Sequence, residues 1–124
     1  MSEKGKMIDK LDEVVELSIL YDFYGELLSD HKKHIFEEYV HNDLSLSEIA
    51  ELNDISRQGV YDIVKRCSKE LRDYESKLKL ISKFDTVKDK LLEIKELVSK
   101  PLSSNRDNLK EKITTLADDI LKEL

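Results

Sequence analysis

The stretch LSLSEIAELNDISRQGVYDIVKR, residues 44–66, decides the fold of this chain. Apolar residues recur at helical spacing on both sides of Asn53 and Asp54, whose side chains tolerate the left-handed backbone of a tight turn. Ala50 is the small residue that two closely approaching helices need between them. The apolar contacts around the turn are supplied by Ile49, Ile55, Val60 and Ile63. The pattern predicts a helix-turn-helix over residues 45–66.

Both helices of this motif have recognisable beginnings. Ser45, followed three residues later by Glu48, fits a capping box, in which each side chain accepts a hydrogen bond from the other residue's backbone amide. Ser56 can cap the second helix. At the turn, Asp54 must adopt the positive φ for which glycine is the usual residue, and its short polar side chain allows this.

Composition indicates an all-α protein. The 124 residues are the size of one ordinary domain, and 39% of them are charged while 40% are hydrophobic, a mixture typical of amphipathic helices. Three glycines and one proline are too few for the many turns of a sandwich, a barrel or a doubly wound sheet.

Cysteine content and hydropathy indicate the compartment. Cys67 is the only cysteine, so the chain can form neither an internal disulfide nor a cysteine-based zinc site. No window approaches the roughly 20 apolar residues of a membrane span, and no signal segment is evident. We therefore expect a cytoplasmic protein that does not insert into a membrane.

The N-terminal third has the pattern of two helices. The first carries one apolar stripe at Leu17, Tyr21, Tyr24 and Leu28, and a second on another side at Leu20, Phe23 and Leu27. A helix that is apolar on two sides must be covered on two sides, which predicts a homodimer. Ser29 can cap the second helix, which Asn42 and Asp43 end. Its inward residues are Ile35, Phe36, Tyr39 and Val40.

The C-terminal part has the pattern of a long helical extension. One stripe comprises Leu71, Tyr74, Leu78 and Ile81, and an offset stripe comprises Phe84, Val87, Leu91, Ile94 and Val98. The offset predicts a bend near residues 81–85. We therefore predict a helical domain over residues 1–82 and an extension over 83–124, broken near 100–104 by Pro101. Ser103 or Ser104 can cap the last helix, whose stripe comprises Leu109, Ile113, Leu116, Ile120 and Leu124.

The charge distribution marks one candidate binding surface. The net charge of −6 argues against indiscriminate binding to nucleic acid, but residues 56–72 hold five basic residues against two acidic ones, a local charge of +3. Arg and Gln near the start of a recognition helix can read base edges in a major groove, and Ser56 and Lys65 suit phosphate contacts. The candidate nucleic-acid-binding residues are Ser56, Arg57, Gln58, Tyr61, Lys65, Arg66 and Lys69. The alternative is an ordinary solvated helix face.

Other polar residues have simpler interpretations. His34, Glu38 and His41 share a helical face, which we interpret as solvated rather than as a metal site. Cys67 lies on the inner face of its helix and is interpreted as a core residue rather than a nucleophile. The tyrosines other than Tyr61 lie among leucines and are expected in the core or at an interface, with their hydroxyls at the rim. No phosphate loop, dinucleotide fingerprint or nucleophile–base motif occurs, so we expect neither an enzyme nor a bound cofactor.

Three segments resemble one known family. YDFYGELLSDHKK (21–33), DLSLSEIAELNDISRQGVYDIVKR (43–66) and LRDYESKLKL (71–80) are together similar to the YlxM-like helix-turn-helix family. The resemblance covers roughly residues 10–84 and leaves residues 85–124 outside. It implies a three- or four-helix core without a wing, like region four of bacterial sigma factors. It also places contacts in the SRQGVYDIVK stretch.

The resemblance implies a role in protein targeting, because members of that family are described as regulators or accessory components of the signal recognition particle pathway. One hypothesis is a nucleic-acid-binding regulator that inserts the helix beginning at Ser56 into a groove of DNA or contacts signal recognition particle RNA. The alternative is a protein-interaction module that docks on the signal recognition particle GTPase or its RNA without binding DNA. Net acidity favours the alternative, and the basic residues after Ser56 favour the first hypothesis.

Overall fold

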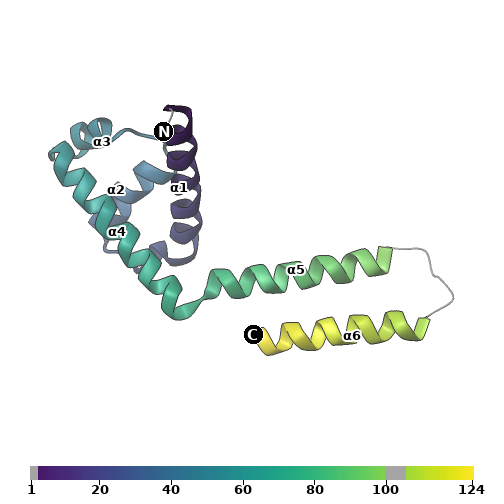
Figure 1. Ribbon diagram of the computed structural model, residues 1–124. Helices are drawn as coiled ribbons and strands as arrows, with labels where there is room; N and C mark the ends of the chain where they lie inside the picture. Colours follow the sequence, from purple (N-terminus) through teal and green to yellow (C-terminus); the bar gives the residue numbers. More distant parts are fainter. Residues whose placement is uncertain (1–2, 100–105) are drawn as a thin grey trace. The chain divides into compact units, whose positions relative to one another are not determined.

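The computed structural model describes residues 3–99 and 106–124, with side chains described from residue 11 onward. Its helices are α1 (Glu3–Tyr24), the 3-10 turn η1 (Gly25–Leu27), α2 (Asp30–Val40), α3 (Leu46–Asn53), α4 (Arg57–Leu78), α5 (Leu80–Ser99) and α6 (Arg106–Glu123) (Figure 1). The described residues contain no strand, which confirms the all-α prediction.

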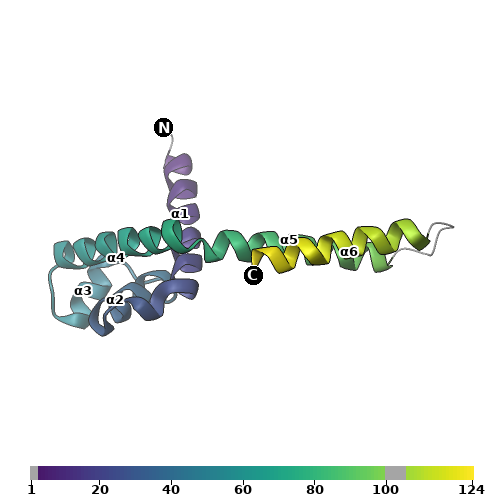
Figure 2. The ribbon, with the colours of Figure 1, turned by 90° about the horizontal axis from the view of Figure 1, so that it is seen from below.

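The chain forms two compact units, Met1–Leu78 and Lys79–Leu124. In the first, α4 packs against α1, α2 and α3 (Figures 1 and 2). Its apolar core contains Leu17, Leu20, Tyr24, Leu28, Ile35, Phe36, Val40, Ile49, Ala50, Val60, Val64, Cys67 and Leu71. The core combines one stripe from each helix, as amphipathic helices require.

Helix α1 follows its predicted pattern only in part. Leu20, which we assigned to a second stripe, is buried in the same core as Leu17 and Tyr24, whereas Leu27 is 54% exposed. A different apolar ridge lies on the surface of this helix, formed by Leu11, Val15 and Ile19. We call these three residues the α1 ridge.

Polar contacts fix α1 against its neighbours. The Tyr24 hydroxyl donates to Glu75 Oε1 on α4 at 2.5 Å, and its ring stacks on Tyr74 with centroids 6.0 Å apart. The Tyr21 hydroxyl donates to Glu37 Oε2 on α2 at 2.9 Å. Burial, together with this hydrogen bond to a carboxylate, raises the pKa of Tyr21 to about 12. Three helices are thus joined through tyrosine hydroxyls at the rim of the core.

Helix α2 ends where Asn42 and Asp43 predict, but its N-cap lacks the expected hydrogen bond. Ser29 occupies the N-cap position, but its side chain makes no capping hydrogen bond. The helix ends at Val40 with His41 as its C-cap, directly before Asn42 and Asp43. Asp43 takes a left-handed φ of 54°, and the amide of Leu44 donates back to the carbonyl of Glu38 at 3.3 Å, which closes the end of the helix.

The break after α4 lies at Lys79 rather than within residues 81–85. Lys79 has a φ of 55°, which ends α4 at Leu78 and lets α5 begin at Leu80. One left-handed residue is enough to interrupt helical hydrogen bonding, and no glycine, proline or change of stripe marks this position in advance. The unit boundary accordingly falls at residues 78 and 79, four residues before the boundary expected from the sequence.

In the second unit, α5 and α6 run antiparallel, side by side (Figures 1 and 2). Lys90 Nζ on α5 lies 3.5 Å from Asp119 Oδ2 on α6. Val87 and Ile94 are half-buried, but Leu91 stays exposed, so the pair covers only part of the predicted stripe. Two helices can enclose only one side of each other. The predicted break near 100–104, with Pro101 and the caps Ser103 or Ser104, lies outside the described residues.

None of the described helices is long and apolar enough to cross a membrane.

Candidate nucleic-acid interface

The first helix of the motif begins as predicted. The backbone amide of Glu48 donates to Ser45 Oγ at 3.1 Å, and the amide of Ser45 donates to Glu48 Oε1 at 3.2 Å. This reciprocal pair is a complete capping box and confirms the predicted start of α3. Ile49, one turn into the helix, is fully buried. The cap and the buried isoleucine together fix where α3 lies.

The turn also follows the prediction. Asp54 adopts a φ of 55° and a ψ of 43°, the left-handed conformation expected for it. The amide of Ile55 then donates to the carbonyl of Ala50 at 3.1 Å. Ser56 follows as the cap of α4, because its Oγ accepts from the amide of Gly59 at 2.9 Å. The connection between the two helices is therefore held by backbone geometry and one serine.

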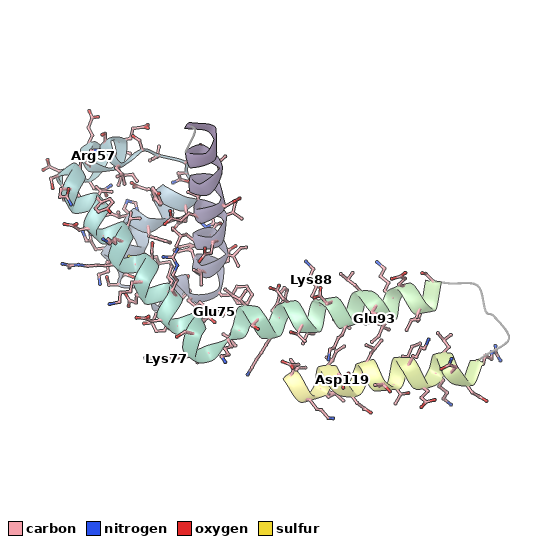
Figure 3. All side chains as sticks on the ribbon, viewed as in Figure 1. Arg57, Glu75, Lys77, Lys88, Glu93 and Asp119 are labelled. Carbon is pink, nitrogen blue, oxygen red and sulfur yellow. The ribbon has the colours of Figure 1, made fainter. Side chains whose placement is uncertain are left out.

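The candidate residues occupy the exposed side of α4. Arg57 lies at its beginning, beside α3 (Figure 3). The Gln58 amide donates to Asp62 Oδ1 at 3.1 Å, so one of its donors is engaged within the helix. Tyr61 is 46% exposed, as expected for the one tyrosine off the inner face, and Lys65 Nζ lies 5.9 Å from its ring centroid. The side chains of Ser56, Arg66 and Lys69 are also exposed.

A cleft of about 990 Å³ lies between α1 and α4, and residues of the α2–α3 connection and of the start of α3 also line it. Five of the seven candidate residues line it, namely Arg57, Tyr61, Lys65, Arg66 and Lys69. Ser56 and Gln58 do not line it. The opposite wall includes Glu13, Val14 and Leu17 of α1. The spacing of apolar residues in the sequence predicts that α1 has an inner face. It does not predict which face of α4 stays uncovered when α1 packs against that helix.

The cations of this surface differ in their partners. Arg72 Nε lies 3.2 Å from Glu16 Oε1, and Arg72 Nη2 lies 4.0 Å from Glu13 Oε1, so this arginine is paired with α1. Among the described residues, no carboxylate lies within ion-pair distance of Arg57, Lys65, Arg66 or Lys69. These four cations of α4, unlike Arg72, are therefore not neutralised by an ion pair with a described carboxylate.

The polar face of α2 is not solvated as a whole, which corrects our expectation for Glu38. This side chain is 8% exposed, accepts from Asn53 Nδ2 at 3.0 Å and lies 2.7 Å from His34 Nε2. A buried carboxylate must be hydrogen-bonded, and Asn53 is the last residue of α3. Glu38 therefore fastens the first helix of the motif to α2. No group of three potential metal ligands occurs among the described residues.

Cys67 is a core residue, as predicted. Its side chain is fully buried, and burial raises the pKa of the thiol to about 11. The sulfur therefore remains protonated near neutral pH, and a protonated thiol is a poor nucleophile. Cys67 packs the inner face of α4 behind the candidate interface.

The capped helix pair, its left-handed turn and the basic outer face of α4 define a helix-turn-helix protein. The chain belongs to the UPF0122 family, because the family model described as "Putative helix-turn-helix protein, YlxM / p13 like" matches residues 11–116. It is 45% identical over 109 residues to the UPF0122 protein of Clostridium perfringens strain 13, covering 88% of this chain and 93% of that protein. The UPF0122 protein of Clostridium novyi is 39% identical over 113 residues, covering 90% and 98%. That of Caldanaerobacter subterraneus is 49% identical over 87 residues, covering 70% and 74%.

The extent of this match corrects the expectation that residues 85–124 depart from the family. The family model continues to residue 116, so α5 and more than half of α6 belong to it. A helical hairpin is constrained mainly by the spacing of its apolar residues, which many different sequences satisfy. That part of the chain therefore carries no local motif comparable to SRQGVYD at residues 56–62.

Proposed function

We propose that this protein binds nucleic acid, without catalysing a reaction on it, through the exposed face at the beginning of α4. The observation that carries the proposal is the set of four cations, Arg57, Lys65, Arg66 and Lys69, that have no carboxylate partner among the described residues. Unpaired cations on the second helix of a helix-turn-helix are placed where phosphates and base edges meet the recognition helix. Confining the proposed contacts to one helix of a chain with a net charge of −6 favours selective contact over general coating.

The ligands to be tested follow from the family resemblance, which links such proteins to the signal recognition particle pathway. We propose duplex DNA and signal recognition particle RNA as the two candidates, with the protein acting as a regulatory or accessory component in the cytoplasm. Each ligand would meet the same face of α4, but the groove that admits a helix is the major groove of B-form DNA. The major groove of A-form RNA is too narrow to admit a helix, so α4 would contact RNA at unpaired segments.

The test is a salt series on the full-length protein, measured by fluorescence anisotropy with each nucleic acid. Replacing Arg57 and Lys65 together by alanine is expected to weaken binding about tenfold and to reduce the slope of log K against log salt by about two. The matched control replaces the exposed Lys88 and Lys112 of the second unit and should leave both quantities unchanged. If wild type and the Arg57/Lys65 variant bind every nucleic acid equally weakly, the proposal is wrong.

The proposal includes a dimer that presents two α4 helices, paired through the α1 ridge. Leu11, Val15 and Ile19 are 63%, 59% and 43% exposed and follow one another at four-residue spacing, the arrangement by which one helix packs on another. Asp12 and Asp22 flank the ridge, so screening by salt should strengthen pairing of two identical copies. In sedimentation experiments wild type is expected to be dimeric and Val15→Glu monomeric. A wild type that sediments as a monomer at every salt concentration would rule out this pairing.

A further inference from the structure

The cleft between α1 and α4 has an apolar floor that nucleic-acid binding does not explain. Five apolar side chains line it, contributed by α1, the α2–α3 connection, the start of α3, and α4: Val14, Leu17, Leu44, Leu46 and Val64. The rings of Tyr39 and Tyr61 extend this lining. Contact with a DNA backbone would leave such a floor uncovered, because phosphates and sugars bind through charge and hydrogen bonds.

The cleft has room for about three turns of one helix. Its α4 wall extends from Arg57 to Lys69 before Arg72 pairs with Glu13 and Glu16 of α1, which is about 18 Å along the helix axis. A helix about 10 Å in diameter, sunk to half its thickness over that length, displaces roughly 700 Å³. The cleft holds about 990 Å³.

The charges around the cleft select the polar face of that helix. Five cations line it, namely Arg57, Lys65, Arg66, Lys69 and Arg72, against three carboxylates, Glu13, Asp43 and Glu48. Arg72 and Glu13 pair with each other, so four cations remain against Asp43 and Glu48. An occupant with carboxylates along its exposed edge is therefore complementary to the α4 wall.

We infer that this cleft is a docking groove for an acidic amphipathic helix of a protein partner. The apolar stripe of the helix lies on Val14, Leu44 and Leu46, and its carboxylates pair with Lys65 and Lys69 at the rim. This is the helix-in-groove mode of recognition, in which apolar anchors supply affinity and rim charges supply selectivity. The inference does not depend on nucleic-acid binding, since its apolar anchors lie outside the candidate nucleic-acid set.

The experiment uses the full-length protein and a fluorescein-labelled designed peptide of about four helical turns, with leucines on one face and glutamates on the other. One comparison peptide has lysine in place of every glutamate, and a second has the same composition with the leucines moved off one face. Fluorescence anisotropy is expected to show binding of the acidic amphipathic peptide at least about tenfold tighter than of either comparison peptide. Equal binding of all three peptides would overturn the inference.

Leu46→Ser and Leu52→Ser make a matched pair on α3, because Leu46 lines the cleft whereas Leu52 is 69% exposed outside it. We expect Leu46→Ser to weaken peptide binding about tenfold and Leu52→Ser to leave it within about twofold. Neither change removes a cation, so duplex DNA binding should be the same in both variants. If Leu46→Ser weakens DNA binding but not peptide binding, the cleft is a nucleic-acid site and the inference is wrong. Val14→Ser, on the opposite wall, repeats the test should Leu46→Ser fail to fold.

Discussion

Phe36→Ala is expected to lower the free energy of unfolding of the first unit by about 3–5 kcal/mol. Phe36 is fully buried on α2, and its ring centroid lies 5.9 Å from that of Tyr21 on α1. Truncation removes the transfer energy of an aromatic side chain and leaves a cavity at the junction of two helices, which cannot close without moving one of them. A helix-turn-helix needs that junction, because α2 is the support against which α3 and α4 pack.

Intrinsic tyrosine fluorescence makes the measurement specific, because all five tyrosines lie before residue 79 and the chain has no tryptophan. Urea titration followed by this signal therefore reports the first unit even if the second unfolds separately. Leu52→Ala, at an exposed position on α3, should change the same free energy by no more than about 0.5 kcal/mol. A loss below about 1 kcal/mol for Phe36→Ala would mean that the α1–α2 junction can collapse around the gap.

The helix-turn-helix could be read from the sequence because each of its parts depends on local chemistry. Ser45 and Glu48 form their capping box through residues only three apart, and Ser56 caps α4 onto Gly59 over the same distance. Asp54 supplies the left-handed turn by its own backbone preference. None of these three features depends on what the helix-turn-helix packs against. Periodicity likewise predicted the exposed positions of Arg57, Gln58, Tyr61, Lys65 and Lys69 on the second helix.

Features that depend on distant parts of the chain could not be read in this way. The cleft needs α1 on one wall and α4 on the other, and no spacing within either helix specifies that pairing. Lys79 interrupts helical structure between α4 and α5, although lysine has no special preference for a positive φ. Arg72 had the same charge as its neighbours in the sequence, yet the structure pairs it with two glutamates of α1.

Glu38 is the clearest example of a residue whose surroundings depend on distant parts of the chain. Its replacement is expected to have the second large effect on stability. Glu38→Ala should lower the free energy of unfolding of the first unit by about 2–3 kcal/mol, because it removes buried volume and the carboxylate that accepts from Asn53 Nδ2 at 3.0 Å. Asn53 keeps its hydrogen bond to the carbonyl of Ile49 at 2.8 Å, so the loss falls on the link between α2 and α3 rather than on α3 itself. Hydrogen exchange should accordingly rise more in α3 than in α1.

Two further variants separate this link from a general effect of charge. Glu51→Ala removes an exposed carboxylate from α3 and should cost no more than about 0.5 kcal/mol. Glu38→Gln keeps the shape and one acceptor for Asn53 and should fall between the other two. If Glu38→Ala is no more destabilising than Glu51→Ala, the buried carboxylate does not fasten α3. The hydrogen bond to Asn53 would then be a consequence of apolar packing around Ile49 rather than a cause of the position of α3.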